Sequence, residues 1–404
     1  MNILYIAYSC DPYFGSENKI GWNIPLEASK NHRVFVLTKE EHKKNIQHYC
    51  IENGIDNIRF YYADIKEIYK KIFRPPFYSG RLNIWHKKAL PIAEKICREN
   101  GIEIIHQIAP IEFRSIGKYY GIPDTKFVCG PLAGGQNVPK PLMSYTGKDK
   151  PVEKLREIIN RFYKRKIKAS GILNKCDCIL YANYETKAFL EPSAKRTVIP
   201  ETALKKSELV NTFEKDDNKE ECVFLVVSRF TATKGYNLLF DAVKKIPDSL
   251  NYKIKIIGYG PLDNEVKALF ESDKNVMRHT EFLGRLPFSK MNEQYQSADA
   301  LVFPTFREAT GSVILEAMAN GLPVITANRC GGSVLCSPSY AYLYSAASKN
   351  GWANHLRFAM LHCINNLDEV HEKGRKAREA AEHFTFEKRV ETYSKIYEDL
   401  LNRK

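Results

Sequence analysis

Short apolar runs alternate along the chain with longer segments of helical periodicity. In the first half, the runs of strand length are Ile3–Tyr8, Val34–Leu37, Ile58–Tyr62, Ile102–Ile105, Phe127–Cys129 and Ile179–Ala182. Near-continuous apolar character is typical of parallel strands that are buried on both faces. Helical patterns such as Ile92–Cys97 and Glu185–Leu190 lie between these runs. The alternation predicts an α/β fold with a doubly wound sheet.

The alternation stops once and then restarts. The segment Lys205–Glu221 is polar, of mixed charge and without an apolar period, which is typical of a linker or a solvated helix end. Beyond it we predict strands at Val223–Ser228, Lys253–Gly258, Ala300–Phe303 and Pro323–Thr326, a helix at Asn237–Lys245 and a closing helix at Phe386–Leu401. A chain of 404 residues is too long for one core. We therefore predict two Rossmann-like domains, 1–204 and 222–385, joined by a linker at 205–221 and followed by a helix at 386–404. Ligands of such sheets bind at the carboxyl ends of the strands, so a central cleft between the domains is the expected site.

The segment 303–325 combines a strand end, a loop and a helix. The backbone N–H groups of Gly311, Ser312 and Val313 would lie free at the start of this helix, where unpaired donors and the helix dipole favour a phosphate. Two carboxylates, Glu308 in the loop and Glu316 on the helix, accompany them. Glu316 lies among apolar residues and needs polar partners, for which sugar hydroxyls are suitable. The alternative is ordinary helix capping by Thr310 or Ser312, with both glutamates solvated.

Two cations follow the first strand of the second domain. Arg229 leaves the strand end, and Lys234 lies at the start of the next helix. A cation at a helix N-terminus is unfavourable unless an anion is present, so this pair suits a diphosphate. The alternative is a surface arginine and lysine that happen to lie near a helix start.

The second half of the chain resembles the retaining family 4 (group 1) glycosyltransferases of the GT-B fold. The resemblance rests on Ser-Arg-Phe-Thr-Ala-Thr-Lys-Gly from Ser228, Ile-Gly-Tyr-Gly-Pro-Leu from Ile257, Glu-Phe-Leu-Gly-Arg-Leu from Glu281, and the Glu-x7-Glu run that continues to Pro-Val at 323–324. The order and spacing of these four motifs cover residues 222–335. A Gly-Ser-Glu-x3-Gly-Trp-Asn segment from Gly15 and the segment Gly130–Gly135 resemble one branch of that family less specifically.

The resemblance implies a role for each matching residue. Arg229 and Lys234 would hold the donor diphosphate, and Glu308 would contact hydroxyls of the transferred sugar. Glu316 would bind the ribose. The family also implies that the first domain binds the acceptor, that the second binds the donor, and that the closing helix packs on the first domain. The other implied donor contacts are Gly15, Ser16, Arg285, Leu286, Gly311, Ser312 and Val313.

The acceptor side departs from the family pattern. Many relatives have a histidine after an N-terminal strand, where this chain has Cys129-Gly130-Pro131. His106 is the nearest histidine at a predicted strand end, and Gly134 and Gly135 are further candidates. The alternative for His106 is a packed, structural histidine. No Asp-x-Asp motif occurs in the chain, so we expect no metal and no other cofactor.

Charge is concentrated in the first half of the chain. The net charge of the chain is +14, and residues 1–200 hold 33 Lys and Arg against 20 Asp and Glu. The segment Lys154–Lys168 is a basic amphipathic helix with aromatic residues, which is typical of contact with an anionic membrane surface. A docked helix with a solvated basic face is an equal alternative, and nucleic acid is disfavoured because no binding motif accompanies the charge. Singly scattered cysteines and the absence of a long apolar run predict a cytoplasmic protein, either soluble or peripheral on the inner face of the membrane.

The resemblance, taken with these features, implies a metal-independent retaining hexosyltransferase that uses a nucleotide-diphosphate sugar, UDP rather than GDP. Its acceptor would be a glycan or lipid-linked saccharide in surface polysaccharide or glycolipid synthesis. Two alternatives remain: a GT-B-fold nucleotide-sugar epimerase, and a non-catalytic protein that binds sugar nucleotides or membranes.

Overall fold

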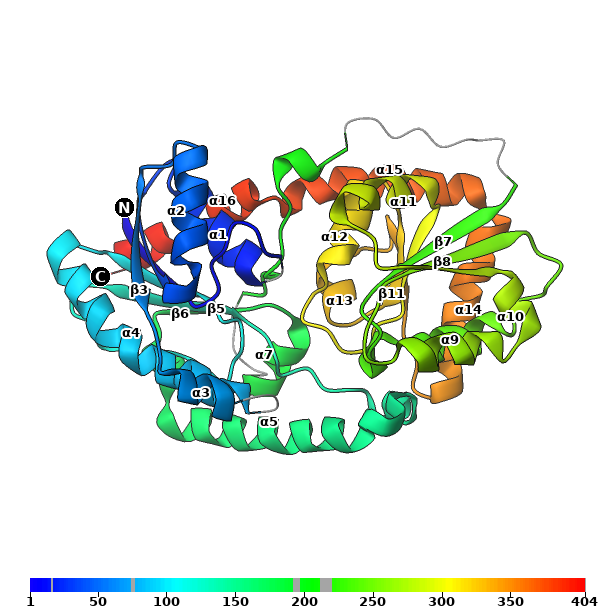
Figure 1. Ribbon diagram of the computed structural model, residues 1–404, viewed down its shortest axis with the longest axis horizontal. Helices are drawn as coiled ribbons and strands as arrows, with labels where there is room; N and C mark the ends of the chain where they lie inside the picture. The colour runs from blue at the N-terminus through cyan, green and yellow to red at the C-terminus, as the bar shows by residue number, and fades with distance from the viewer. Residues whose placement is uncertain (16, 74–76, 192–196, 211–219, 404) are drawn as a thin grey trace. The chain divides into compact units, whose positions relative to one another are not determined.

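The computed structural model describes residues 1–15, 17–73, 77–191, 197–210 and 220–403. The chain divides into two units (Figure 1). One unit comprises Met1–Gly135, Arg156–Ala203 and Phe386–Lys404, and the other comprises Gln136–Leu155 and Leu204–Thr385. Each unit contains a parallel six-stranded sheet with helices on both faces. The predicted pair of doubly wound sheets is confirmed.

The first sheet has the strand order β3-β2-β1-β4-β5-β6, and the second has the order β12-β11-β10-β7-β8-β9. The first six strands are β1 Asn2–Ala7, β2 Arg33–Lys39, β3 Ile58–Ala63, β4 Ile104–Ala109, β5 Lys126–Leu132 and β6 Cys178–Tyr181. The second six are β7 Cys222–Val227, β8 Tyr252–Ile257, β9 Thr280–Gly284, β10 Ala300–Phe303, β11 Val324–Ala327 and β12 Ala341–Tyr344.

Helices connect the strands and cover both faces of each sheet. In the first unit they are α1 Glu17–Ala28, α2 Lys43–Glu52, α3 Glu67–Ile72, α4 Tyr78–Asn100, α6 Ile172–Lys175, α7 Tyr184–Leu190 and α16 Phe386–Asn402. The long helix α5, Lys150–Ser170, crosses the division between the units. In the second unit they are α8 Tyr236–Val243, α9 Asp263–Glu271, α10 Lys274–Arg278, α11 Met291–Ser297, α12 Ser312–Ala319, α13 Gly331–Leu335, α14 Lys349–Asn365 and α15 Leu367–Ala381.

Strand β1 shows why the predicted strands are apolar throughout. Leu4 and Ile6 pack into the core under α4, whereas Ile3 and Tyr5 pack into the core under α1 and α16. Successive side chains of a strand point to opposite faces, and here both faces are buried. Strand β7 divides in the same way, with Phe224 in one core and Leu225 in the other.

Two edge strands were not predicted, β9 and β12. Within β9 only Thr280 is buried, and β12 has four residues, two of them half-buried. β9, Thr-Glu-Phe-Leu-Gly, has only two apolar residues in succession, and β12, Ala-Tyr-Leu-Tyr, is apolar but only four residues long, so neither stands out as a strand in the sequence. Most of the predicted linker, residues 211–219, lies outside the described residues.

Residues 136–155 pack on the second unit, although the sequence analysis placed them in the first domain. The Tyr145 hydroxyl donates to Asp241 at 2.7 Å, and Asn237 donates to the Tyr145 carbonyl at 2.9 Å. Val138, Leu142 and Tyr145 join the core cluster that contains α8 and α14. These contacts connect residues about a hundred positions apart, so no local pattern in the sequence indicated them.

Helix α16 packs on the first unit and covers His106. Both ring nitrogens of His106 are engaged: Nε2 donates to the Gly130 carbonyl at 2.8 Å, and Nδ1 accepts from the Tyr397 hydroxyl at 2.6 Å. A carbonyl only accepts, so the ring is held as the neutral tautomer. Burial lowers the pKa of His106 to about 3. With no exposed surface, this histidine has the structural role and offers no atom to a substrate.

The ten cysteines are all free thiols. Among the described residues no helix has the length and apolar character needed to cross a bilayer.

We expect the protein to lose stability as the pH falls below 6.5, because buried neutral His86 and His106 both have a folded-state pKa of about 3. The unfolded chain takes up protons between pH 6.5 and 3 that the folded chain does not. Each histidine then costs up to about 1.4 kcal/mol per pH unit in the free energy of unfolding. Denaturant titrations at several pH values give the free energy of unfolding as a function of pH. Below pH 6.5 this free energy should fall less steeply for His106→Gln than for the exposed control His48→Gln. Equal slopes would contradict the assignment.

Candidate active site

The strand order of the second sheet reverses between β7 and β10, which are neighbours in space. Connections on the two sides of such a reversal leave on opposite faces of the sheet, and ligands bind at the carboxyl ends of the two strands. Both of the charged groups predicted from the sequence follow these two strands. The cation pair follows β7, and the carboxylate pair follows β10.

Lys234 and Glu308 meet at this edge of the sheet. Lys234 ends a short 3-10 turn, Ala232–Lys234, and its ammonium group donates to Glu308 Oε2. The side chains retain 18% and 30% of their exposure, so both lie near solvent. The pair is partly buried and still reached by solvent, so its net contribution to stability is small. Its position at the strand reversal is therefore better explained by ligand binding than by folding.

Backbone contacts hold the two loops together. The Phe306 amide donates to the Thr233 carbonyl at 3.1 Å. Gly235 adopts a φ of +78°, and a Cβ at this position would lie 2.1 Å from the Pro304 carbonyl oxygen. Only glycine permits both this backbone conformation and this close approach.

The start of α12 is open to an anion. Gly311 precedes the helix with a φ of +94°, and no side chain caps the first turn. The Thr310 hydroxyl is buried and has no hydrogen-bond partner in the described part of the chain, so capping by Thr310 is not observed. The amides of Ser312 and Val313 therefore begin a helix whose dipole favours negative charge.

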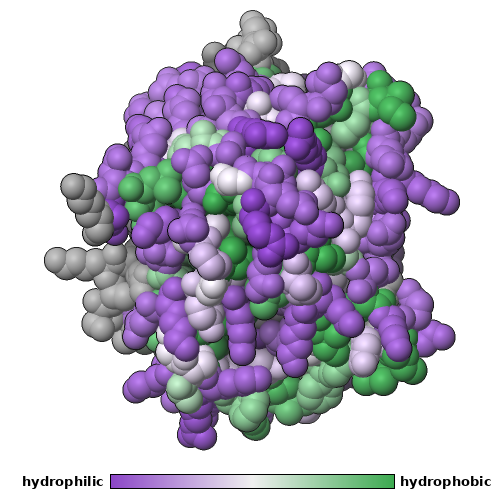
Figure 2. All heavy atoms as spheres, turned by 90° about the vertical axis from the view of Figure 1, so that its left-hand side faces the viewer, coloured by the Kyte–Doolittle hydropathy of each residue, from purple (hydrophilic) through white to green (hydrophobic). Residues whose placement is uncertain are grey.

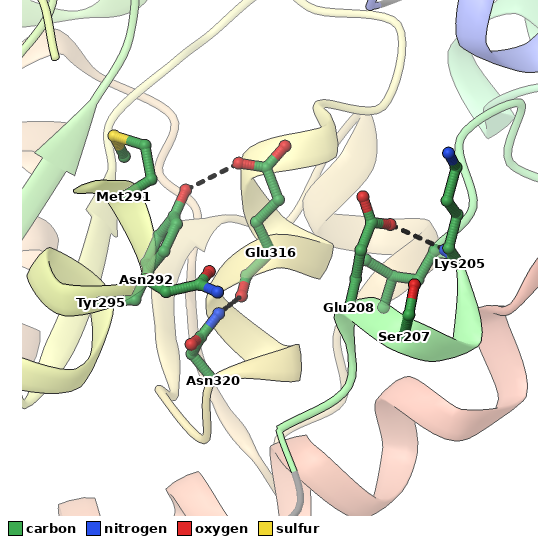
Figure 3. A pocket seen from close by; sticks show the side chains of 9 residues that line it. Lys205, Ser207, Glu208, Met291, Asn292, Tyr295, Glu316 and Asn320 are labelled. Atoms are coloured by element: carbon green, nitrogen blue, oxygen red, sulfur yellow. Dashed lines mark hydrogen bonds between the residues drawn. The ribbon is translucent and has the colours of Figure 1, made fainter. Parts of the chain in front are cut away.

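Glu316 lies one turn into α12 and borders a pocket of about 310 Å³ (Figure 3). The Tyr295 hydroxyl donates to Glu316 Oε2 at 2.9 Å, and Asn320 Nδ2 donates to the Glu316 carbonyl at 2.9 Å. Burial, and then the neighbouring carboxylate, raise the pKa of Tyr295, so its hydroxyl remains a donor. The other lining residues are Leu204, Lys205, Ser207, Glu208, Met291 and Asn292.

The remaining predicted donor contacts are placed as follows. Arg229 is exposed after β7. The Arg285 guanidinium carbon lies 4.8 Å from the centroid of the Tyr259 ring, which brings the loops after β8 and β9 together, and Leu286 is partly buried beside it. Gly15 is exposed in the loop before α1, and Ser16 lies outside the described residues.

The predicted acceptor glycines follow β5 in the first unit. Gly134 has a φ of +100°, and its carbonyl accepts from Arg156 at 3.0 Å and from Asn160 at 3.1 Å. The Gly135 amide donates to the Thr186 hydroxyl at 3.3 Å. Both glycines therefore fix the chain locally, and nothing in these contacts assigns them to a substrate.

The sequence analysis missed a group of charged and tyrosine side chains at the carboxyl edge of the first sheet, which we name the edge cluster. Five segments at this edge supply it: the ends of β1 and β2, the loop after β4, and the first turns of α1 and α4. The pattern Lys39-Glu40-Glu41-His42 directly after a buried strand was the available indication. The edge cluster consists of Tyr8, Glu17, Lys39, Tyr78, Arg81, Glu112 and Arg114.

Comparisons with known proteins find similarity to glycosyltransferases. Residues 210–377 match the family model described as glycosyl transferases group 1. An uncharacterized glycosyltransferase of Methanocaldococcus jannaschii is 34% identical over 44% of this chain and 48% of its own length. The chain thus spans about half of that relative. N-acetyl-alpha-D-glucosaminyl L-malate synthase of Bacillus anthracis is 25% identical over 98% of this chain and 97% of its own length.

A solved structure shows the same fold. Sucrose-phosphate synthase from Thermosynechococcus elongatus superposes with a TM-score of 0.66 at 17% identity, and the match covers 100% of both chains. At this identity the similarity concerns the fold alone, and it agrees with the two sheets described above.

We expect Gly331→Ala to disturb the loop that carries Glu308, because an added Cβ would lie 1.6 Å from the Thr310 carbonyl oxygen. Overpacking of this kind lowers the free energy of unfolding by about 1–3 kcal/mol. Gly121→Ala is the control, since nothing lies within 4 Å of its added Cβ. Denaturant unfolding of both variants checks the prediction, and equal stability would show that the loop is not held by this contact.

Proposed function

We propose that the chain, whose residues 210–377 match the model described as glycosyl transferases group 1, transfers a hexose-type sugar from a nucleotide-diphosphate sugar to a glycan or lipid-linked saccharide. The product would belong to surface polysaccharide or glycolipid synthesis. The observation that carries this proposal is the contact of Lys234 with Glu308 beside the uncapped start of α12. A cation, a carboxylate and open amide donors there suit a phosphorylated sugar.

Each group has a role in this proposal. Arg229 and Lys234 bind the diphosphate, and the first amides of α12 bind its oxygens. Glu308 accepts hydrogen bonds from hydroxyls of the transferred sugar, and in doing so it leaves Lys234 for the phosphate. Glu316, held by the Tyr295 hydroxyl, accepts from the ribose hydroxyls.

The reaction proceeds with retention and without a metal in this proposal. The bond between the anomeric carbon and the phosphate oxygen breaks, and the diphosphate leaves with the electron pair. The acceptor oxygen forms the new glycosidic bond on the same face, and its proton passes to the departing phosphate. Arg229, Lys234 and the start of α12 stabilise the charge that develops on the leaving group. UDP is favoured over GDP because it is the more commonly used donor.

Two other functions remain distinguishable by experiment. A nucleotide-sugar epimerase of the same fold would turn over donor without acceptor, whereas a transferase releases the nucleoside diphosphate when acceptor is added. A non-catalytic binding protein would release none.

We expect Lys234→Ala to reduce turnover about 10²–10³-fold with little change in melting temperature, because the lost cation stabilises the transition state and the pair it forms is half-exposed. Release of nucleoside diphosphate is the measurement, after a thermal-shift screen with nucleotide sugars has identified the donor. Lys244→Ala is the matched control, since Lys244 pairs with Asp241 at 2.9 Å away from this edge. Full activity in Lys234→Ala would exclude the proposed role.

A peripheral contact with an anionic membrane is the second part of the proposal. On α5, Ile158 and Phe162 each retain 61% of their exposure, and the exposed cations Arg161 and Arg165 lie beside them. Figure 2 shows hydrophobic patches among hydrophilic residues on one face of the molecule. An apolar row with flanking cations suits the headgroup region of an anionic bilayer.

We expect the double variant Ile158→Ser, Phe162→Ser to bind vesicles that contain phosphatidylglycerol at least about tenfold more weakly, because each buried apolar side chain contributes about 1.5–3 kcal/mol. Co-sedimentation with vesicles is the measurement. Phe358→Ser is the control, since Phe358 is exposed on α14 in the second unit. Equal vesicle binding by the double variant and the unaltered protein, or no binding by the unaltered protein, would contradict the proposed membrane contact.

A further inference from the structure

The edge cluster of the first unit is a connected group. Lys39 Nζ lies 4.5 Å from the centroid of the Tyr8 ring, and the Arg81 guanidinium carbon lies 5.8 Å from the same centroid. The Ile111 amide donates to the Glu17 carboxylate at 3.4 Å. Burial and the charge of Glu112 raise the pKa of this carboxyl, and the charge of Lys39 lowers it. The strand reversal between β1 and β4 lies at this edge, where sheets of this order bind ligands.

Arg81 is the cation of the edge cluster that packs between two tyrosine rings. Within the described residues its guanidinium meets the faces of Tyr8 and Tyr78, the latter at 4.5 Å, and no carboxylate lies within ion-pair distance. Its Nε is fully buried and has no hydrogen-bond partner among those residues. A guanidinium presents a planar fork of donors that matches the oxygens of a phosphate or carboxylate. The guanidinium also donates to the Tyr78 hydroxyl and interacts with the charge of Glu41, so the donor left without a partner among the described residues is Nε.

Lys39 strengthens this preference for an anion. The residue retains 7% of its exposure, and the buried Tyr8 and Trp85 rings surround that end of the strand. A charge in such a low-dielectric setting acts more strongly than one in water. Lys39 also contacts Glu41, whose side chain is 46% exposed, so this partner faces solvent on one side.

Glu17 supplies the complementary group. It begins α1 and is half-buried, and burial raises the pKa of its carboxyl. A carboxyl at this position can hydrogen-bond a hydroxyl of a ligand whose anionic group lies at Arg81. The edge cluster therefore offers both an anion site and a hydroxyl site within one unit.

We propose that the edge cluster is the acceptor subsite and that the acceptor is a hydroxyl compound carrying a phosphate or carboxylate, bound through Arg81. This inference rests on the proposed function and supplies the substrate class that the donor site leaves open. Arg81 and Lys39 bind the anionic group, and Glu17 positions the hydroxyl that receives the sugar. Free sugar phosphates and lipid-linked diphosphates share this chemistry.

The test is a binding measurement that needs no turnover. Isothermal titration is carried out on the full chain, with the donor site saturated by the nucleoside diphosphate that the thermal-shift screen selects. The probes are inorganic phosphate, glucose 6-phosphate, a short-chain prenyl-diphosphate glucose and, as the neutral partner, glucose. We expect the anionic probes to bind more tightly than glucose, and the prenyl compound to exceed glucose 6-phosphate if the natural source is a lipid.

Variants of Arg81 test whether this residue causes the difference in affinity between the anionic probes and glucose. Arg81→Gln should weaken the binding of the anionic probes at least about tenfold, because one charge-assisted hydrogen-bond pair is lost. The affinity for glucose should not change. Arg81→Lys should restore part of the affinity. Arg98→Gln, at the exposed far end of α4, is the control. Equal binding of glucose and glucose 6-phosphate, no binding of any anionic probe, or unchanged affinities in Arg81→Gln would overturn the proposal.

The same samples separate this proposal from the proposed function. If the nucleoside diphosphate raises the melting temperature of the unaltered chain and of Arg81→Gln equally, the donor half is intact whatever the anionic probes do. If it raises neither, the proposed function fails independently of the edge cluster.

Discussion

Strands β7 and β10 lie side by side in the second sheet, although β8 and β9 separate them along the chain. This adjacency brings the loops after the two strands together, so that Lys234 reaches Glu308 and the Thr233 carbonyl receives the Phe306 amide. The close contact of Gly235 with Pro304 fixes the distance between the loops. If other strands separated β7 from β10, each would add about 4.8 Å between the two loops, and Lys234 would not reach Glu308.

The interior on both sides of that sheet is apolar, which confines polar chemistry to the carboxyl edge. There the uncapped amides of α12, the ammonium of Lys234 and the guanidinium of Arg229 all favour negative charge. The carboxylates have the opposite preference and suit hydroxyl donors. Glu316 shows this most clearly, because Tyr295 already donates to one of its oxygens and the pocket beside it offers further space (Figure 3). A ligand with a diphosphate and hydroxyl groups at its two ends satisfies both sets.

Sequence reasoning succeeded where the chemistry is local and failed where it depends on distant contacts. Central strands such as β1 and β7 were found because both of their faces are buried, whereas β9 and β12 are short edge strands with few buried residues. The helix start at Gly311 and the turn at Lys234 are each encoded by a short segment of the sequence. The placement of residues 136–155 depends on Asp241 and Asn237, and no short pattern reveals that contact.

The predicted acceptor residues also depend on contacts between distant parts of the chain, which no short sequence pattern reveals. His106 was a candidate because it directly follows the predicted strand Ile102–Ile105, but its environment comes from α16, nearly three hundred residues away. The edge cluster was missed for a related reason, since Tyr8, Lys39 and Arg81 come from three separate elements. Charged residues that directly follow buried strands are the pattern that would have located it.

The central claim is that the edge of β7 and β10 is built for a diphosphate. The most direct measurement compares the affinities of uridine and UDP for the unaltered chain and for the double variant Arg229→Ala, Lys234→Ala by isothermal titration. The account predicts that UDP binds at least about a hundredfold more tightly than uridine, since charge-assisted hydrogen bonds contribute about 1.5–3 kcal/mol each, and that the double variant loses most of this difference. Equal affinities for the two ligands, or a difference that survives in the double variant, would contradict it.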